Sequence, residues 1–252
     1  GFGELGPVLP REPSAPMKIM LSFDDGLKDH LTIAAGELEK RGWRGVFCIV
    51  SDWVGKDDRK LNWDDVRELV RRGHVIATHT KSHASLGGLC RKGQQNRVRA
   101  EIRESCDIIE RETGVRPGLL CLPGTDCHAD VVRIAREEGL ETMTVPRYCF
   151  GEWPHDAGDE IRRLRGNGMT RVDFLVHGIR PEGGGWKPFQ TVEKFRAYLD
   201  EIKLCESSGE IRVVQELEKG SLRAADNLQP ICQRLSGSEL WGMRQKHPAV
   251  VN

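Results

Sequence analysis

Short apolar runs alternate with helical patterns along most of the chain, and this alternation constrains the fold more than any other feature of the sequence. The apolar runs are typical of buried strands and lie at 18–23, 45–50, 74–79, 118–123, 141–145, 161–164, 173–177 and 211–214, the run at 161–164 being the weakest. Helical patterns lie at 27–41, from Asn62 to about Gly73, and at 95–113, 128–138 and 191–206. Regular β-α alternation predicts a parallel sheet with crossover helices. About seven strands favour an α/β barrel over a doubly wound sheet, and no nucleotide-binding glycine motif supports the latter.

The chain length of 252 residues suits a single large domain. Met17 stands just before the first strong strand, so we expect residues 1–16 to form an N-terminal arm. The main domain should then occupy 17–220. Residues 221–252 show weak periodicity, and we expect a C-terminal extension that packs outside the domain as a helix or loop.

Composition argues against two classes of partner. Lys plus Arg and Asp plus Glu each number 38, so the formal net charge is zero and the basic surface typical of nucleic-acid binding is not expected. No apolar run reaches the roughly 18 residues of a transmembrane helix, so a membrane partner is not expected either. The N-terminus lacks a signal-peptide pattern, which favours a cytoplasmic location; secretion is the alternative if the chain is a processed form.

The cysteine pattern also argues against one kind of metal site. None of the eight cysteines forms a C-x-x-C pair, so a zinc site built from cysteines is not expected. Cys48 and Cys121 lie inside apolar runs, which is typical of buried small side chains. We expect reduced thiols, because a chain of this size folds without disulfides.

Titratable residues follow four of the predicted strands at the point where each strand ends. The set comprises Asp24, Asp25, His79, His83, His177 and the segment 123–126. Active sites of parallel barrels gather at the carboxyl ends of the strands. We therefore expect these side chains to meet on one rim.

His79 and His83 are spaced for joint metal binding. A separation of four residues directs both imidazoles the same way on a helical turn. With one carboxylate they form a two-His, one-carboxylate set that leaves positions open, as a catalytic zinc site requires. Of two adjacent carboxylates, one can bind the metal while the other acts as base. The competing interpretations are two surface histidines, and a simple turn at Asp24-Asp25-Gly26.

Three segments resemble the motifs of a known family, the polysaccharide deacetylases, which are the NodB-homology domains of carbohydrate esterase family 4. Ser22-Phe23-Asp24-Asp25-Gly26 resembles the first motif, and His79-Thr80-Lys81-Ser82-His83 resembles the second, H-[ST]-x-x-H. Leu175-Val176-His177 resembles the last, L-x-H. The resemblance covers about 17–215 in the family's order and spacing. It implies a distorted (β/α) barrel with about seven parallel strands, with 17–220 as the catalytic domain.

The resemblance also implies a role for each motif residue. Asp24 corresponds to the catalytic base, and His177 to the acid that protonates the leaving amine. Asp25, His79 and His83 correspond to the metal ligands. The metal is usually Zn²⁺, although imidazole-carboxylate sites also accept Co²⁺, Ni²⁺ or Mn²⁺. The implied substrate is an acetylated carbohydrate.

Four further positions are candidates for substrate contact. By the same resemblance, the backbone N–H of Gly124 binds the oxyanion, and Thr80 either contacts substrate or shapes the metal loop. Trp153 corresponds to the aromatic wall of the groove, with Trp186 as the other candidate; each is nearly as typical of a packed core aromatic. Trp53 we interpret as core or surface packing.

One departure from the family pattern concerns the third motif. Family members usually have there an Arg that orients the base, whereas this chain has Cys121 at that position. Asp126 and His128 follow and are candidates for supporting contacts, with His128 better interpreted as the start of a helix. His30, close to the first motif, is interpreted as a helix-face residue.

Four functions come into question for these residues. We favour a metal-dependent deacetylase acting on N-acetyl groups of an amino-sugar poly- or oligosaccharide. An O-acetyl esterase of the xylan type would use the same residues. A metal-free relative acting on cyclic amides conflicts with the intact Asp25, His79 and His83. An inactive carbohydrate-binding relative finds support in the missing third-motif Arg, but Asp24 and His177 are both retained.

Overall fold

One parallel sheet organises the molecule. The computed structural model describes residues 15–143, 147–149, 156–180 and 191–215. Within these residues the strands are β1 (Met17–Phe23), β2 (Val46–Ile49), β3 (Val75–Thr78), β4 (Leu119–Leu120), β5 (Glu141–Thr142), β6 (Arg147–Cys149), β7 (Arg171–Val176) and β8 (Ile211–Val213). Their order is β5-β4-β3-β2-β1-β7-β6, with β8 paired to β1, and every pairing is parallel.

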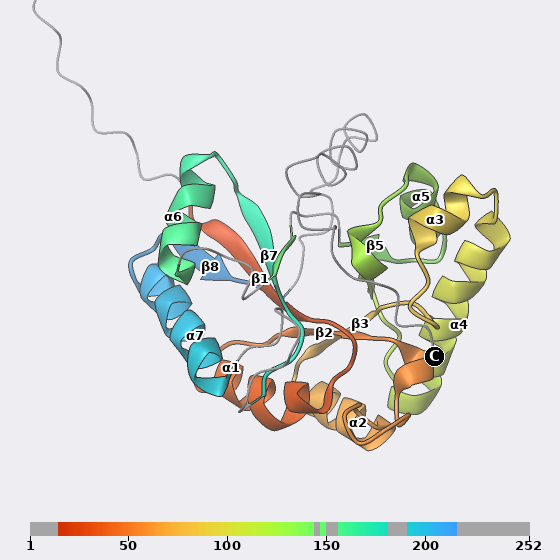
Figure 1. Ribbon diagram of the computed structural model, residues 1–252, viewed down its shortest axis with the longest axis horizontal. Helices are drawn as coiled ribbons and strands as arrows, with labels where there is room; N and C mark the ends of the chain where they lie inside the picture. The colour runs from red at the N-terminus through yellow and green to blue at the C-terminus, as the bar shows by residue number, and fades with distance from the viewer. Residues whose placement is uncertain (1–14, 144–146, 150–155, 181–190, 216–252) are drawn as a thin grey trace, which may run out of the picture.

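Helices connect the strands and line the outer side of the curled sheet (Figure 1). They are a π-helical turn at His30–Ala35, α1 (Gly36–Glu39), α2 (Trp63–Arg71), α3 (Leu86–Arg91), α4 (Gln95–Thr113), α5 (Ala129–Glu137), α6 (Ala157–Gly166) and α7 (Val192–Ser207). Short 3-10 turns lie at Ser51–Trp53 and Pro123–Thr125. The sheet forms a curled half-barrel, which confirms the prediction of a distorted (β/α) barrel.

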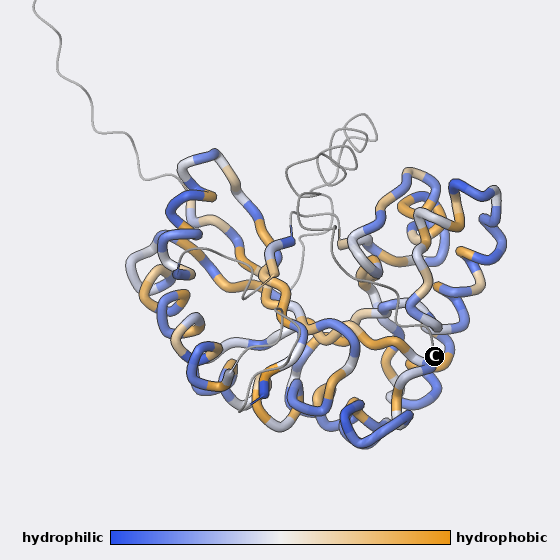
Figure 2. The backbone as a smooth tube through the Cα atoms, in the orientation of Figure 1, coloured by the Kyte–Doolittle hydropathy of each residue, from blue (hydrophilic) through white to orange (hydrophobic). Residues whose placement is uncertain are grey.

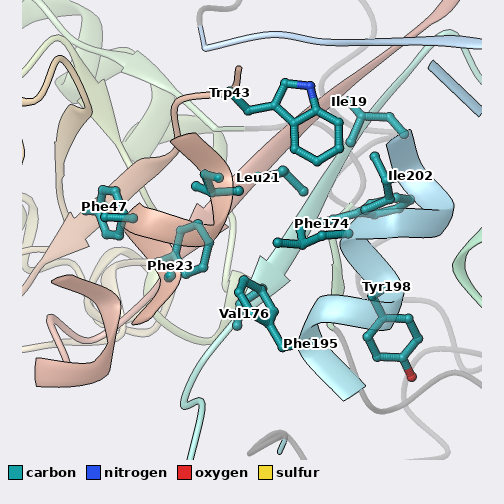
Figure 3. Packing of buried hydrophobic residues seen from close by; sticks show 14 of the residues in the cluster. Ile19, Leu21, Phe23, Trp43, Phe47, Phe174, Val176, Phe195, Tyr198 and Ile202 are labelled. Atoms are coloured by element: carbon teal, nitrogen blue, oxygen red, sulfur yellow. The ribbon is translucent and has the colours of Figure 1, made fainter. Parts of the chain in front are cut away.

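The alternation of side chains along β1 determines which face meets the helices. Ile19, Leu21 and Phe23 are fully buried and belong to the large core, together with residues of α7 (Figure 3). The strands at the centre are accordingly apolar, while the helices carry polar residues around the outside (Figure 2). Successive strand residues point to opposite faces, so Met20 and Ser22 point into the half-barrel. The buried strand runs therefore position the helices on one face and the candidate site on the other.

The concave side of the sheet has a small apolar core of its own. It comprises Met20, Val46, Cys48, Ala77, Leu119, Cys121 and Met143. Beside it lie buried polar groups, among them Ser22, Asp24 and Asp173. Buried polar groups need partners to offset lost hydration, so this polar patch indicates a built network.

Two predicted elements differ from the structure. The segment 161–164, predicted as a weak strand, lies inside α6, where Ile161 and Leu164 are buried at helical spacing and Asp156 caps the first turn. The missing strand is β6 at 147–149, in a stretch predicted as irregular. Three residues are too few to show a period of two, so only the pairing with β7 reveals this strand.

Part of the predicted domain organisation lies outside the described residues. The predicted C-terminal extension lies outside the described residues, as do residues 1–14 of the predicted arm. The seven cysteines of the described part form no disulfide with one another, and Cys232 lies outside it. Among the described helices, none combines the length and apolar character needed to cross a bilayer.

Phe195 provides a test of the large core. Its side chain is fully buried on α7, and its ring centroid lies 6.2 Å from that of Phe23. Phe195→Ala should lower the free energy of unfolding by about 3–5 kcal/mol, measured by denaturant titration, because it removes packed apolar surface and leaves a cavity. Leu204→Ala on the same helix, where the residue is 70% exposed, should change it by less than about 0.5 kcal/mol. Similar losses for both variants would contradict this packing.

Candidate active site

The end of β1 places the two adjacent carboxylates. The Asp24 N–H donates to the carbonyl of Val176 at 3.1 Å, so Asp24 continues the pairing of β1 with β7. The next residue, Asp25, has a left-handed backbone with φ of 77°, and Gly26 follows with φ of 57°. Because of this turn, the side chains of the two aspartates point in different directions at the carboxyl end of the sheet.

The two histidines come from the end of β3. The His79 N–H donates to the carbonyl of Ile49 at 2.8 Å, which ties this residue to β2. In the described residues, positive φ outside glycine occurs only at Asp25, Thr80, His83 and Thr125. Three of them lie in the first and second motif segments, and Thr125 lies in the segment 123–126 that follows β4. Non-glycine residues avoid this conformation and adopt it mainly where surrounding structure enforces it, often at functional sites.

A glutamate from α4 holds the loop between the histidines. Glu101 is 8% exposed, and its carboxylate accepts the backbone N–H of Ser82 at 2.9 Å and the Ser82 hydroxyl at 2.7 Å. Its carbonyl accepts the Lys81 N–H at 3.1 Å. Thr80 is buried, and its hydroxyl accepts the Ala84 N–H at 3.2 Å. Thr80 therefore shapes this loop, whereas the part played by Glu101 has no signal in the sequence.

Three potential ligand atoms face one another. Asp25 Oδ1 lies 3.5 Å from His83 Nε2 and 3.7 Å from His79 Nε2. The His79 Nδ1–H donates to the carbonyl of Cys121 at 3.0 Å, which leaves Nε2 on the side of the carboxylate. Asp25 Oδ1 is buried and has no hydrogen-bond partner. A cation between these three atoms would satisfy that oxygen, so the residues fit a divalent metal.

Trp53 supports one of the histidines. Its ring stacks on His83 with centroids 4.9 Å apart, and the Lys60 ammonium lies 4.3 Å from the centroid of the Trp53 ring. The same ammonium donates to the carbonyl of Asp25 at 3.0 Å. Trp53 was interpreted from sequence as general packing, but it packs against a candidate ligand. The spacing between Trp53 and the second motif contains no hint of this contact.

Asp24 lies next to the ligand group and is almost inaccessible to solvent. Its Oδ2 is 3.7 Å from His79 Nε2, and its Oδ1 accepts from Arg147 Nη2 at 2.9 Å and from the Cys121 thiol at 3.4 Å. Burial alone would favour the neutral acid. The Arg147 guanidinium, with His79 and His177, instead holds the pKa of Asp24 well below its usual range. Asp24 is thus ionised at neutral pH.

His177 completes the group of titratable side chains at the end of β7. Its carbonyl accepts the Nε2–H of buried His30, whose Nδ1 accepts the Leu27 N–H at 3.2 Å. The Cys149 thiol lies 3.5 Å from His177 Nδ1. Burial lowers the pKa of His177, and the charges of Asp24 and Asp25 are near enough to oppose that shift. His30, predicted on a helix face, is therefore buried against the backbone of the site.

The remaining sequence candidates have separate places. Gly124 lies in the 3-10 turn after β4 with φ of 60° and is exposed. Trp153 and Trp186 lie outside the described residues. The Asp126 carboxylate accepts from Arg91 at 2.7 Å and from the Ser85 hydroxyl, so it contacts the two ends of α3.

His128 starts a helix, as predicted. It is the N-cap of α5, where its Nδ1 accepts the Asp130 N–H at 3.2 Å. It also lies in a second group of potential metal ligands with Cys90 and Asp130. Asp130 is already paired with Arg133 at 3.0 Å, and no buried oxygen lacks a partner in this group, in contrast to the group at Asp25.

The fold and the placement of these side chains define a class of protein, a distorted (β/α) barrel with titratable groups at the carboxyl ends of its strands. The sequence matches the polysaccharide deacetylase family model over residues 11–143, just over half of the chain. The chain belongs to the polysaccharide deacetylase family. YxkH of Bacillus subtilis (strain 168), which has a provisional polysaccharide deacetylase name, is 22% identical over 123 residues. That match covers 49% of this chain and 42% of YxkH, so the chain spans less than half of this relative.

Solved structures share the fold at low sequence identity. A peptidoglycan N-acetylglucosamine deacetylase matches with a TM-score of 0.59 and 18% identity, covering 80% of this chain and 87% of the other. An acetyl xylan esterase from Clostridium thermocellum, solved with cobalt, gives 0.56 and 18%, covering 78% and 87%. A family 4 pseudoenzyme from Bacillus anthracis gives 0.59 and 17%, covering 81% and 66%. Family membership therefore does not by itself establish catalysis, and the site residues must carry that argument.

Proposed function

We propose that this protein is a metal-dependent deacetylase that hydrolyses N-acetyl groups of an amino-sugar poly- or oligosaccharide. The observation that carries the proposal is the buried, unpartnered Oδ1 of Asp25 between the Nε2 atoms of His79 and His83. Ionised Asp24 lies beside it, within 3.7 Å of His79. Hydrolysis of an unactivated acetyl group requires this arrangement, in which a set of metal ligands lies next to a carboxylate that does not bind the metal and can act as base.

The three ligands suit Zn²⁺, and Co²⁺, Ni²⁺ or Mn²⁺ are alternatives with the same ligand types. A cation bound there would supply Lewis-acid stabilisation of the acetyl carbonyl and lower the pKa of water. Asp25, His79 and His83 would hold it, and the Cys121 carbonyl would keep His79 in the binding tautomer. Lys60 and Trp53 would limit the movement of Asp25 and His83.

The chain's own residues would move the protons. Asp24 accepts a proton from the attacking water, because Arg147 keeps its carboxylate ionised. Arg147 binds Oδ1, so Oδ2 faces His79 and the proposed metal site. His177 donates a proton to the leaving nitrogen. Burial lowers the pKa of His177, which makes its protonated form a stronger acid toward that nitrogen. The Gly124 N–H is proposed to stabilise the oxyanion, while Trp153 and Trp186 remain proposed sugar contacts.

An O-acetyl esterase is the second candidate, because the acetyl-handling groups would be the same. Fold neighbours named for each activity exist, one a peptidoglycan N-acetylglucosamine deacetylase and one an acetyl xylan esterase. An amine is a poorer leaving group than an alcohol and depends more on a proton donor. A proton donor at His177 therefore favours the amide reaction.

Acetate release from two substrate sets tests the proposal. The zinc-reconstituted protein should release acetate from N-acetylglucosamine oligomers and release little from O-acetylated xylan, and chelator-stripped protein should release none. Release from xylan alone would replace the amide activity with the esterase. No release from either set would contradict the proposed activity and favour a carbohydrate-binding relative.

A further inference from the structure

Strand β6 brings a buried arginine to the carboxylate of the candidate base. Arg147 pairs in register with Asp173 of β7, and β7 pairs with β1. Side chains on one face of a sheet recur every second residue, so Ser22 and Asp24 of the β1 segment share the inner face with Asp173. Arg147 lies on β6, on the other side of β7 from β1, and its side chain reaches these three residues.

The guanidinium of Arg147 makes directed contacts to three side chains. Nη2 donates to Asp24 Oδ1 at 2.9 Å and to the Ser22 hydroxyl at 2.9 Å, and Nε donates to Asp173 Oδ2 at 2.6 Å. The Ser22 hydroxyl donates to the same Asp173 oxygen at 2.8 Å. The side chains of Arg147, Asp24 and Asp173 are 4%, 5% and 0% exposed. Such a network is rigid, because a planar guanidinium has fixed donor directions.

We propose that Arg147 is the residue that positions Asp24 as the base, in place of the arginine that the third motif lacks. This inference rests on the proposed function. Arg147 and the Cys121 thiol both engage Asp24 Oδ1, which leaves Oδ2 on the side of His79. The arginine thus fixes the carboxylate rotation that directs one oxygen toward the reaction.

The position of Cys121 agrees with an arginine that comes from β6 and not from the third motif. Cys121 is fully buried after β4, in the third-motif position, and its Sγ lies 3.4 Å from the same Oδ1 that Arg147 binds. A thiol is uncharged and too short to supply a fork of donors. The guanidinium arrives from β6 instead, so the missing motif arginine is no sign of lost activity.

A purely structural role for Arg147 is the competing explanation, because the guanidinium also neutralises buried Asp173. Removing one partner of a buried ion pair is costly, so Arg147→Met alone would confuse the two roles. The double variant Arg147→Met/Asp173→Asn removes both charges of that pair. If Arg147 only balances Asp173, the double variant should recover wild-type turnover.

Kinetics on zinc-reconstituted protein with N-acetylglucosamine oligomers separate the two roles. We expect the double variant to lose about 10²-fold in kcat, the scale typical of a misplaced catalytic group, with KM and bound zinc unchanged. Arg147→Lys should recover part of that loss, and Asp173→Asn alone should lose much less. Arg162→Met is the matched control, because Arg162 pairs with Asp159 on α6 and both side chains are more than half exposed, and it should retain wild-type kcat. Wild-type kcat in the folded double variant would overturn the proposal.

A crystal structure of the double variant supplies a readout that needs no turnover. The Asp24 carboxylate should rotate away from its position beside His79. An Asp24 in its original position would overturn the positioning role, whatever the activity. Wild-type protein that releases no acetate would contradict the proposed function instead, and the position of Asp24 in the variant would still decide the role of Arg147.

Discussion

His79→Ala should abolish stoichiometric zinc binding. The imidazole supplies one of three ligand atoms around the unpartnered Asp25 oxygen, and its Nδ1–H is fixed by the Cys121 carbonyl. Two remaining ligands bind a divalent metal far more weakly than three, so zinc should be lost on dialysis. Asp25→Ala and His83→Ala should behave in the same way. Zinc content after dialysis, measured by elemental analysis, reports the result.

His128→Ala is the matched control for this experiment. His128 caps α5 and belongs to the second group of potential ligands, away from the motif histidines. This variant should keep about one equivalent of zinc. If His79→Ala kept its zinc and His128→Ala lost it, the metal would lie in the group with Cys90 and Asp130, and the ligand assignment would be wrong.

Asp24→Asn should keep the zinc and lose about 10²–10⁴-fold in kcat, the range typical of a general base. The amide has nearly the shape of the carboxylate and can still accept from Arg147 through its oxygen, but it cannot take a proton from water. Zinc content and steady-state kinetics on the same preparation measure both outcomes.

Asp64→Asn is the control, because Asp64 has an 87% exposed side chain on α2 and should leave kcat unchanged. Near-normal turnover in Asp24→Asn would place the base elsewhere. Loss of zinc in the same variant would instead make Asp24 a ligand, an arrangement its 3.7 Å approach to His79 could accommodate.

The sequence predicted the fold well where strands are long and buried. The runs at 18–23 and 173–177 became the long strands β1 and β7, because buried parallel strands are mostly apolar. The segment 161–164 was predicted incorrectly, since a short apolar run is compatible with either a strand or a buried helix face. Strand β6 was missed because its three residues are defined by pairing with β7.

The residues of the candidate site were also predicted only where they belong to local sequence patterns. Asp25, His79 and His83 belong to short motifs, and the strand ends bring them together as the barrel geometry predicts. Glu101 and Arg147 act through contacts between residues far apart in the chain. Arg147 is 123 residues from Asp24, and no spacing rule links the two. Only the sheet order, with β7 between β1 and β6, brings that guanidinium to the carboxylate.

Acetate release during zinc titration of the metal-stripped protein tests the central claim most directly. With N-acetylglucosamine oligomers as substrate, the rate should rise from near zero and saturate at about one equivalent of zinc, because Asp25, His79 and His83 form one site. His79→Ala, titrated in parallel, should stay near zero over the same range. A wild-type rate that is independent of zinc would contradict metal-dependent deacetylation by this site.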